Sequence, residues 1–215
     1  MSAIGNRQSA IRNRMNLLIR AANLYTPTLL KRKKLLELFA CTAAAFECEM
    51  PRPQGLTYDE LLRSYARFTA AQADQLLQHS EMDAPGSTRG VIASDLREAI
   101  SAPRREVAEI RRRLYNGAYR MGAELRGTFR ITNTADALAA ARVLYRALGI
   151  DLQATADGKV TVRRCFFSEF YSGPVCRLIA SLDEGLFAGL SGGGQLSFTQ
   201  RITERNSCCE AHFRQ

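Results

Sequence analysis

Cysteine side chains near the C-terminal end offer the most reactive atoms in the sequence. Cys165 and Cys176 lie on either side of a Ser-Gly-Pro corner, and the vicinal pair Cys208 and Cys209 follows them. A thiolate can act as a nucleophile or as a ligand for a soft metal ion such as zinc. A free thiol can equally pack as a small apolar side chain in a protein core. The sequence leaves these roles open, because it contains no Cys-x-x-Cys pair.

Cys176 has the position of an activated thiol. Ser172 can cap a helix whose first turn contains Pro174, and Cys176 then falls in that first turn. Free backbone N–H groups and the helix dipole favour the thiolate there. Asp183 lies two turns further along the same helix face. We therefore expect Cys176 to be a nucleophile or a metal ligand, with the Asp183 carboxylate as a polar assistant.

The other thiols and a histidine supply possible partners for Cys176. Alternation along the last strand puts Cys208 and His212 on one face, and Cys209 on the other face among apolar residues. One hypothesis gathers Cys165, Cys176 and Cys208 around zinc, with His212 or a nearby carboxylate as the fourth ligand. A second hypothesis uses Cys176 or Cys165 as a nucleophile and His212 as its base. In a third, the thiols are buried and His212 is exposed.

The strand before Cys165 predicts the side on which that thiol lies. Val160 and Val162 alternate with polar residues, so the two valines are expected to face the core. Cys165 is two residues after Arg163 and four after Thr161, so regular alternation places it on their face of the strand. The alternation therefore predicts that Cys165 lies on the opposite face from the valines.

Apolar residues repeat at helical spacing in the first part of the chain and alternate, as in strands, after residue 150. One more helix is expected between the two pairs of strands. Asp157-Gly158 between alternating apolar residues indicates a hairpin. Thr57 with Glu60 forms a capping box, and Thr134 is expected to cap a later helix. This order predicts an α+β fold, in which helices cover an antiparallel sheet. The expected helices are 29–49, 58–78, 95–125, 134–148 and the one between Ser172 and Gly192, and the expected strands are 150–152, 159–164, 196–202 and 208–214.

A polar stretch rich in small residues, 80–94, is the expected linker of the chain. Residues 1–79 are then a helical N-terminal region, and residues 95–215 form the α+β domain that carries the cysteine site. Within 95–125, Gly117, Ala118 and Gly122 leave a bare stripe where another element can approach closely.

Basic residues outnumber acidic ones, with 30 Lys and Arg against 21 Asp and Glu and a net charge of +9. Residues 1–36 contain no acid, and such a basic arm can touch nucleic acid or an anionic membrane surface. We expect a solvated helix face and no nucleic-acid partner, because no nucleic-acid-binding motif is present.

The apolar run 15–19 is too short to span a membrane or to act as a signal peptide, so we expect a cytoplasmic protein. A homodimer through the N-terminal helices stays open.

The order of motifs in the second half of the chain resembles the L-2-amino-thiazoline-4-carboxylic acid hydrolase-like family. The motifs are CFFSEFYSGPVC, DEGLFAGLSGGG, FTQRIT and the Cys-Cys pair, preceded by RRLYNGAYRMGAEL and ARVLYRALGI. They fall roughly within residues 105–213. The layout is also similar to vinyl-reductase-type sensor domains, which can hold zinc through cysteines. This sequence has Gln200 and Thr203 where those domains have Glu-x-x-Cys.

The hydrolase resemblance implies opening of a small sulfur- and nitrogen-containing ring at a C–N bond, with a thiolate or a metal-bound hydroxide as nucleophile. The sensor resemblance implies non-catalytic binding of a small molecule or of zinc. A small molecule is the expected partner in both cases, with zinc or no cofactor. The expected catalytic residues are Cys176, Cys165, Asp183 and His212. The arginines expected to bind a substrate carboxylate are Arg163, Arg177 and Arg201. The expected metal ligands are Cys165, Cys176 and Cys208.

Overall fold

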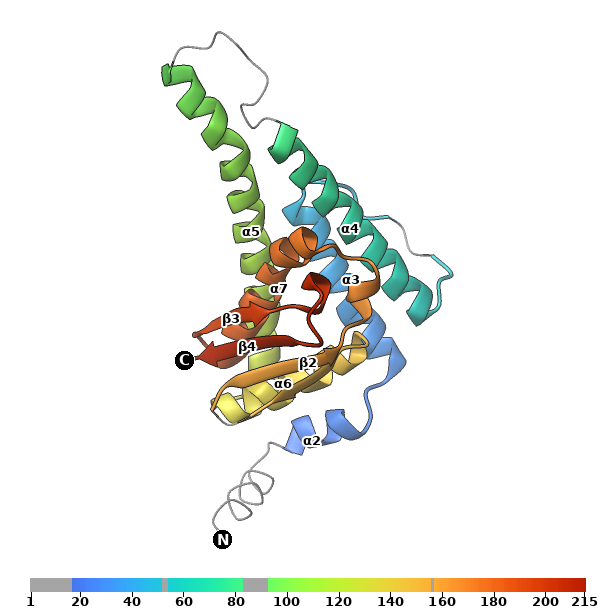
Figure 1. Ribbon diagram of the computed structural model, residues 1–215. Helices are drawn as coiled ribbons and strands as arrows, with labels where there is room; N and C mark the ends of the chain where they lie inside the picture. The colour runs from blue at the N-terminus through green and yellow to red at the C-terminus, as the bar shows by residue number, and fades with distance from the viewer. Residues whose placement is uncertain (1–16, 52–53, 83–92, 156) are drawn as a thin grey trace.

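The computed structural model describes residues 17–51, 54–82, 93–155 and 157–215. Within these ranges, the side chains of residues 80–104 are not described. In these ranges the chain has the α+β fold that the sequence predicts, with helices that precede and cover a four-stranded antiparallel sheet (Figure 1). The helices are α2 (Leu17–Leu24), α3 (Thr28–Ala45), α4 (Tyr58–Met82), α5 (Ala93–Phe129), α6 (Thr134–Ala147) and α7 (Gly173–Ser191). The strands are β1 (Asp151–Ala154), β2 (Lys159–Arg164), β3 (Gln195–Gln200) and β4 (Cys209–Arg214). Two 3-10 turns are η1 (Phe166–Glu169) and η2 (Ile202–Glu204).

Polar side chains define the starts of three helices. The capping box before α4 is confirmed, because Thr57 N donates to Glu60 Oε2 at 2.8 Å and Glu60 N donates to Thr57 Oγ1 at 3.3 Å. Ser172 caps α7 as expected, with Oγ accepting from Val175 N at 3.4 Å. The expected Thr134 cap of α6 is wrong by one residue. Asn133 is the cap, and its Oδ1 accepts from Asp136 N at 2.9 Å.

The sheet has the strand order β1-β2-β4-β3, and all neighbours are antiparallel. The predicted hairpin between β1 and β2 is confirmed, with Leu152 opposite Val162. Side chains alternate between a buried inner face and an outer face. In β4, Cys209 is buried and His212 is exposed, so the predicted division of this strand is confirmed. The inner face packs against α6 and α7 (Figure 1).

Helices α5 and α7 pack at very short range because glycines line their contact. A Cβ added at Gly122 would lie 2.5 Å from Leu186 O, and one added at Gly189 would lie 2.8 Å from Ala123 N. Gly185 likewise faces the backbone of Tyr115. The close approach predicted at Gly122 is therefore confirmed, with α7 as the partner. This contact fixes α7 against the longest helix of the described chain.

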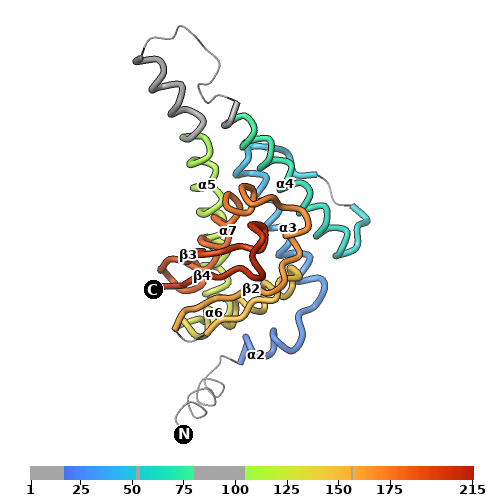
Figure 2. Tube along the Cα trace, in the orientation of Figure 1, coloured from blue at the N-terminus to red at the C-terminus, as the bar shows by residue number. Residues whose placement is uncertain are grey.

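The N-terminal helices and the sheet share one core. Buried residues from Ile19 in α2 to Phe213 in β4 form a continuous cluster. Figure 2 shows α3 and α4 lying beside α5 and α7, and the contacts between these helices agree. Residues 83–92 of the expected linker lie outside the described residues. No helix in the described part of the chain combines the length and the apolar character needed to cross a membrane.

Candidate functional site

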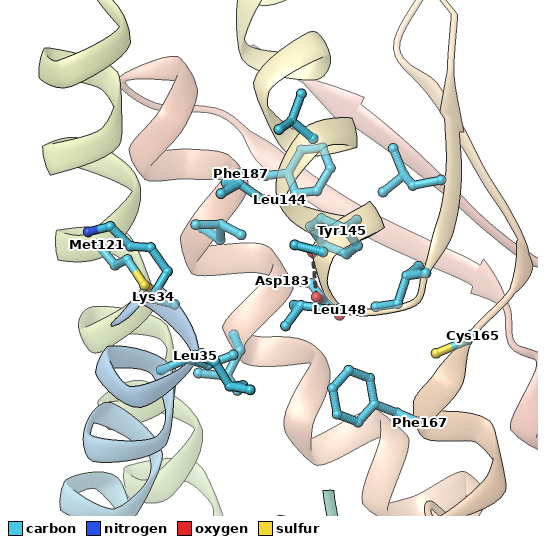
Figure 3. A pocket seen from close by; sticks show the side chains of 18 of the residues that line it. Lys34, Leu35, Met121, Leu144, Tyr145, Leu148, Cys165, Phe167, Asp183 and Phe187 are labelled. Atoms are coloured by element: carbon cyan, nitrogen blue, oxygen red, sulfur yellow. Dashed lines mark hydrogen bonds between the residues drawn. The ribbon is translucent and has the colours of Figure 1, made fainter. Parts of the chain in front are cut away.

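A cavity of about 280 Å³ lies between the helices and the inner face of the sheet (Figure 3). Its wall is mainly apolar, and it draws on α3, α5, α6, α7 and all four strands. Apolar wall residues include Leu35, Met121, Leu144, Val162, Leu186 and Phe187. Polar groups are few. A mainly apolar cavity with a small number of polar groups is the usual form of a small-molecule site.

Asp183 brings a carboxylate into this apolar surrounding. Tyr145 on α6 donates a hydrogen bond from its hydroxyl to Asp183 Oδ1 on α7 (Figure 3). Burial raises the pKa of Asp183 to about 6, although the hydrogen bond from Tyr145 and the charge of Arg201 act in the opposite direction. Burial also raises the pKa of Tyr145 well above its usual value, so the hydroxyl stays a donor. Asp183 can therefore accept hydrogen bonds or exchange a proton near neutral pH.

Arg201 places a positive charge in the cavity wall that acts on Asp183. Its guanidinium lies 4.7 Å from the centre of the Phe198 ring, and its charge lowers the pKa of both Asp183 and Cys176. Nε of Arg201 is buried and has no hydrogen-bond partner among the described residues. A buried donor without a partner costs free energy. The guanidinium as a whole belongs to the cavity wall, so it can donate hydrogen bonds to a ligand acceptor there.

Three thiols line the cavity, and they are not the three that the zinc hypothesis selects. The wall contains Cys165, Cys176 and Cys209. Cys208 is absent from it, and Cys208 Sγ accepts a hydrogen bond from Gln200 Nε2 at 3.2 Å. The buried position expected for Cys209 is confirmed. The sequence already indicated this position, because Cys209 lies on the same strand face as the apolar Ala211.

The predicted side of Cys165 is wrong. Regular alternation ends with β2 at Arg164, and Cys165 begins the turn η1. The thiol therefore lines the same cavity as Val160 and Val162, which it was expected to oppose (Figure 3). Burial of Phe167 in η1 draws the chain inward immediately after the strand.

The cavity thiols are held in the neutral form. Burial raises the pKa of Cys165 to about 12. Burial also raises the pKa of Cys176, although the Thr203 hydroxyl and the charge of Arg201 lower it. The activation expected from the start of α7 is therefore not found, because loss of solvent outweighs the groups that lower the pKa of Cys176. At neutral pH these groups act as polarisable wall atoms.

Alkylation with iodoacetamide measures this thiol protection directly. At pH 7.5 we expect Cys165 in the folded protein to react roughly a thousandfold more slowly than an ordinary thiol, because its thiolate fraction is that much smaller. Labelling at each cysteine is read by peptide mass spectrometry. The same protein in urea is the control, where all six thiols should react at similar rates. Folded-state labelling of Cys176 as fast as in urea would contradict the raised pKa and restore an activated thiol.

The remaining expected site residues lie outside the cavity wall. His212 and Arg163 are exposed on the outer side of the sheet. Arg177 is exposed on α7 and forms a salt bridge with Glu204. The wall, as far as the structure describes it, contains no histidine. The structure thus brings together Cys165, Cys176, Asp183 and Arg201, and it separates them from the histidine expected to act as base.

The expected zinc ligands do not meet. In the described part of the chain, no three side chains of His, Cys, Asp or Glu are grouped so that they could hold a metal ion. Cys208 lies away from Cys165 and Cys176, and the cavity wall supplies no imidazole to replace it. The arrangement therefore does not fit the expected zinc site.

A scan against protein-family models and searches of the curated proteins and the solved structures find no match. The family resemblance of the motifs therefore stays a prediction, and the cavity itself carries the functional argument.

The wall also contains a residue that the sequence analysis missed. Tyr145 lies in the motif ARVLYRALGI, and only the fold shows that its hydroxyl reaches Asp183, 38 residues further along the chain.

Proposed function

We propose that the protein binds a small, mainly apolar molecule in this cavity, as a ligand-binding module. The observation that supports the proposal is an apolar wall interrupted by the Asp183 carboxylate and the Arg201 guanidinium. Apolar surface supplies most of the affinity in such sites, and a few polar groups fix the orientation of the ligand.

The polar groups indicate what the ligand carries. The Asp183 carboxylate accepts hydrogen bonds, whereas the Arg201 guanidinium donates them. A ligand that satisfies both groups carries a donor and an acceptor, as a carboxamide does. We therefore propose an apolar body with one such polar group as the chemical class of the ligand.

Hydrolysis of a small sulfur- and nitrogen-containing ring is the second candidate, and Asp183 is the observation that favours it. A carboxylate with a pKa of about 6 is well suited to act as a general base at neutral pH. Such a base would activate water directly, since the neutral thiols are poor nucleophiles. Loss of ring-opening activity in Asp183→Asn, with activity kept in Cys176→Ser, would assign the reaction to the carboxylate.

Octanamide is a suitable probe for the binding function, because it combines an alkyl body with one donor and one acceptor. We expect titration calorimetry to show saturable binding with a negative heat-capacity change, as burial of apolar surface requires. Leu144→Trp places a larger ring at the cavity wall and should weaken binding at least about tenfold.

The matched control is Leu36→Trp. Leu36 is half-buried like Leu144, and it packs against the core without lining the cavity. Its affinity for octanamide should equal that of the natural protein. Equal affinities for all three proteins, or no heat of binding for the natural protein, would overturn the assignment of the cavity as a binding site.

A further inference from the structure

A second surface exposes large apolar side chains. It is the α2–α3 elbow, which we define as residues 17–34. Leu17, Leu24, Tyr25 and Leu29 are between 73% and 87% exposed. Among the described residues, Tyr119 is the only exposed large apolar side chain outside this segment. Apolar residues concentrated in one exposed segment indicate an interaction surface.

The elbow is fixed with these side chains outward. Ile19 in α2 is only 1% exposed and anchors the helix to the core. Leu17, Arg20 and Leu24 repeat at helical spacing on the side opposite Ile19. The carbonyl of Asn23 also accepts a hydrogen bond from Arg146 Nη1 of α6 at 3.2 Å. The outward direction of the leucines is therefore part of the fold.

Positive charge surrounds these apolar side chains. Residues 17–34 contain five basic residues and no acid. Within the described chain, neither Arg20, Lys31 nor Lys33 forms a salt bridge. Apolar side chains next to unpaired cations match an anionic lipid surface, where the leucines enter the interface and the cations meet the headgroups. A purely apolar protein partner would leave these cations without counter-charges.

The cavity wall includes residues of this same segment. Tyr25, Leu30 and Lys31 belong to the elbow and also line the cavity, and both Tyr25 and Leu30 are exposed. Thr26 and Pro27 continue the shared wall. Elbow residues therefore belong both to the cavity wall and to the exposed apolar surface.

We propose that the α2–α3 elbow docks onto an anionic membrane surface. The leucines and Tyr25 insert among the headgroups, and Arg20, Lys31 and Lys33 face the lipid phosphates and carboxylates. Docking in this orientation turns the elbow side of the cavity wall toward the bilayer. The docking itself is independent of the ligand-binding function proposed above. The cavity could take up a ligand from the membrane only if that ligand-binding function also holds.

Vesicle co-sedimentation tests the proposal. Vesicles of phosphatidylcholine with about 30 mol% phosphatidylserine should bind the protein, and added salt or pure phosphatidylcholine should weaken binding. Leu24→Glu combined with Leu29→Glu should lower the bound fraction at least about tenfold, because both changes oppose insertion and add like charge. Both positions are more than 80% exposed, so the fold should be kept. The control is Tyr119→Glu, an exposed aromatic position on α5 that should bind vesicles as the natural protein does.

Three results would overturn the docking. They are no sedimentation with the anionic vesicles, equal sedimentation with pure phosphatidylcholine, and unchanged binding of the double variant. A natural protein that is a dimer in ultracentrifugation, becomes a monomer in the double variant and ignores vesicles would assign the elbow to a second copy instead. Neither Leu24 nor Leu29 lines the cavity. Octanamide titration of the double variant without vesicles therefore reports on the cavity alone and separates the two proposals.

Discussion

Replacement of Gly189 by alanine is expected to lower the free energy of unfolding by about 3 kcal/mol or more, because overpacked cores force backbone shifts. A Cβ at this position would overlap the carbonyl oxygen of Tyr119 and would lie 2.8 Å from Ala123 N and 2.9 Å from Gly122 Cα. All three atoms belong to the backbone of α5, so no side-chain rotation can relieve the overlap. The two helices must separate, and the loss can be measured by urea denaturation.

Gly127→Ala is the matched control for this experiment. Gly127 lies in the same α5 helix, and a Cβ there would have no neighbour within 4 Å. Alanine should therefore stabilise the protein by about 0.5–1 kcal/mol, through lower entropy of the unfolded chain and better helix propensity. Equal effects of the two changes would show that the contact between α5 and α7 is not as close as described.

Asp183→Asn is expected to raise the stability by about 2–3 kcal/mol at pH 7.5 and to leave it almost unchanged near pH 4. The pKa of Asp183 is about 6 in the folded protein and 3.8 for an ordinary aspartate, so the folded state holds this proton more tightly. The stability due to the protonated carboxyl is complete below pH 4 and is lost as the pH rises to about 6. Asparagine stays neutral and still accepts the Tyr145 hydrogen bond.

The measurement is the difference in free energy of unfolding between Asp183→Asn and the natural protein across this pH range. Tyr145→Phe is a second variant, which keeps the Asp183 carboxyl and changes its pKa. It removes a hydrogen bond that lowers the pKa of Asp183, so the pH at which stability is lost should move above 6. A stability difference that is the same at pH 4 and pH 7.5 would contradict the buried, titrating carboxyl.

The order of elements and two of the three helix starts could be read from the sequence, because they depend on residues a few positions apart. The capping box of Thr57 and Glu60 is such a local signal. The choice between Asn133 and Thr134 was not decided by residue type, since both side chains are good caps. It depends on which backbone geometry the preceding turn allows, and α6 starts after Asn133.

The candidate site was only partly predictable, because burial and distant contacts shape it. Cys165 leaves the alternation where η1 begins, and Phe167 there makes edge contact with the Tyr65 ring from α4. No local pattern contains that contact. The helix start before Cys176 was predicted correctly, but the sign of its pKa shift depends on solvent removed by the whole fold.

The close packing of α7 on α5 holds one side of the cavity by more extensive contacts than the other. The α7 side, which carries Asp183, is tied to α5 through glycine contacts that leave no room for sliding. The α2 side is held by an eight-residue helix with Ile19 as its one buried residue. Local opening needs the least free energy where few apolar contacts must break. Under the proposed binding function, we therefore expect ligand exchange by brief release of α2, while the carboxylate and its partners keep their positions.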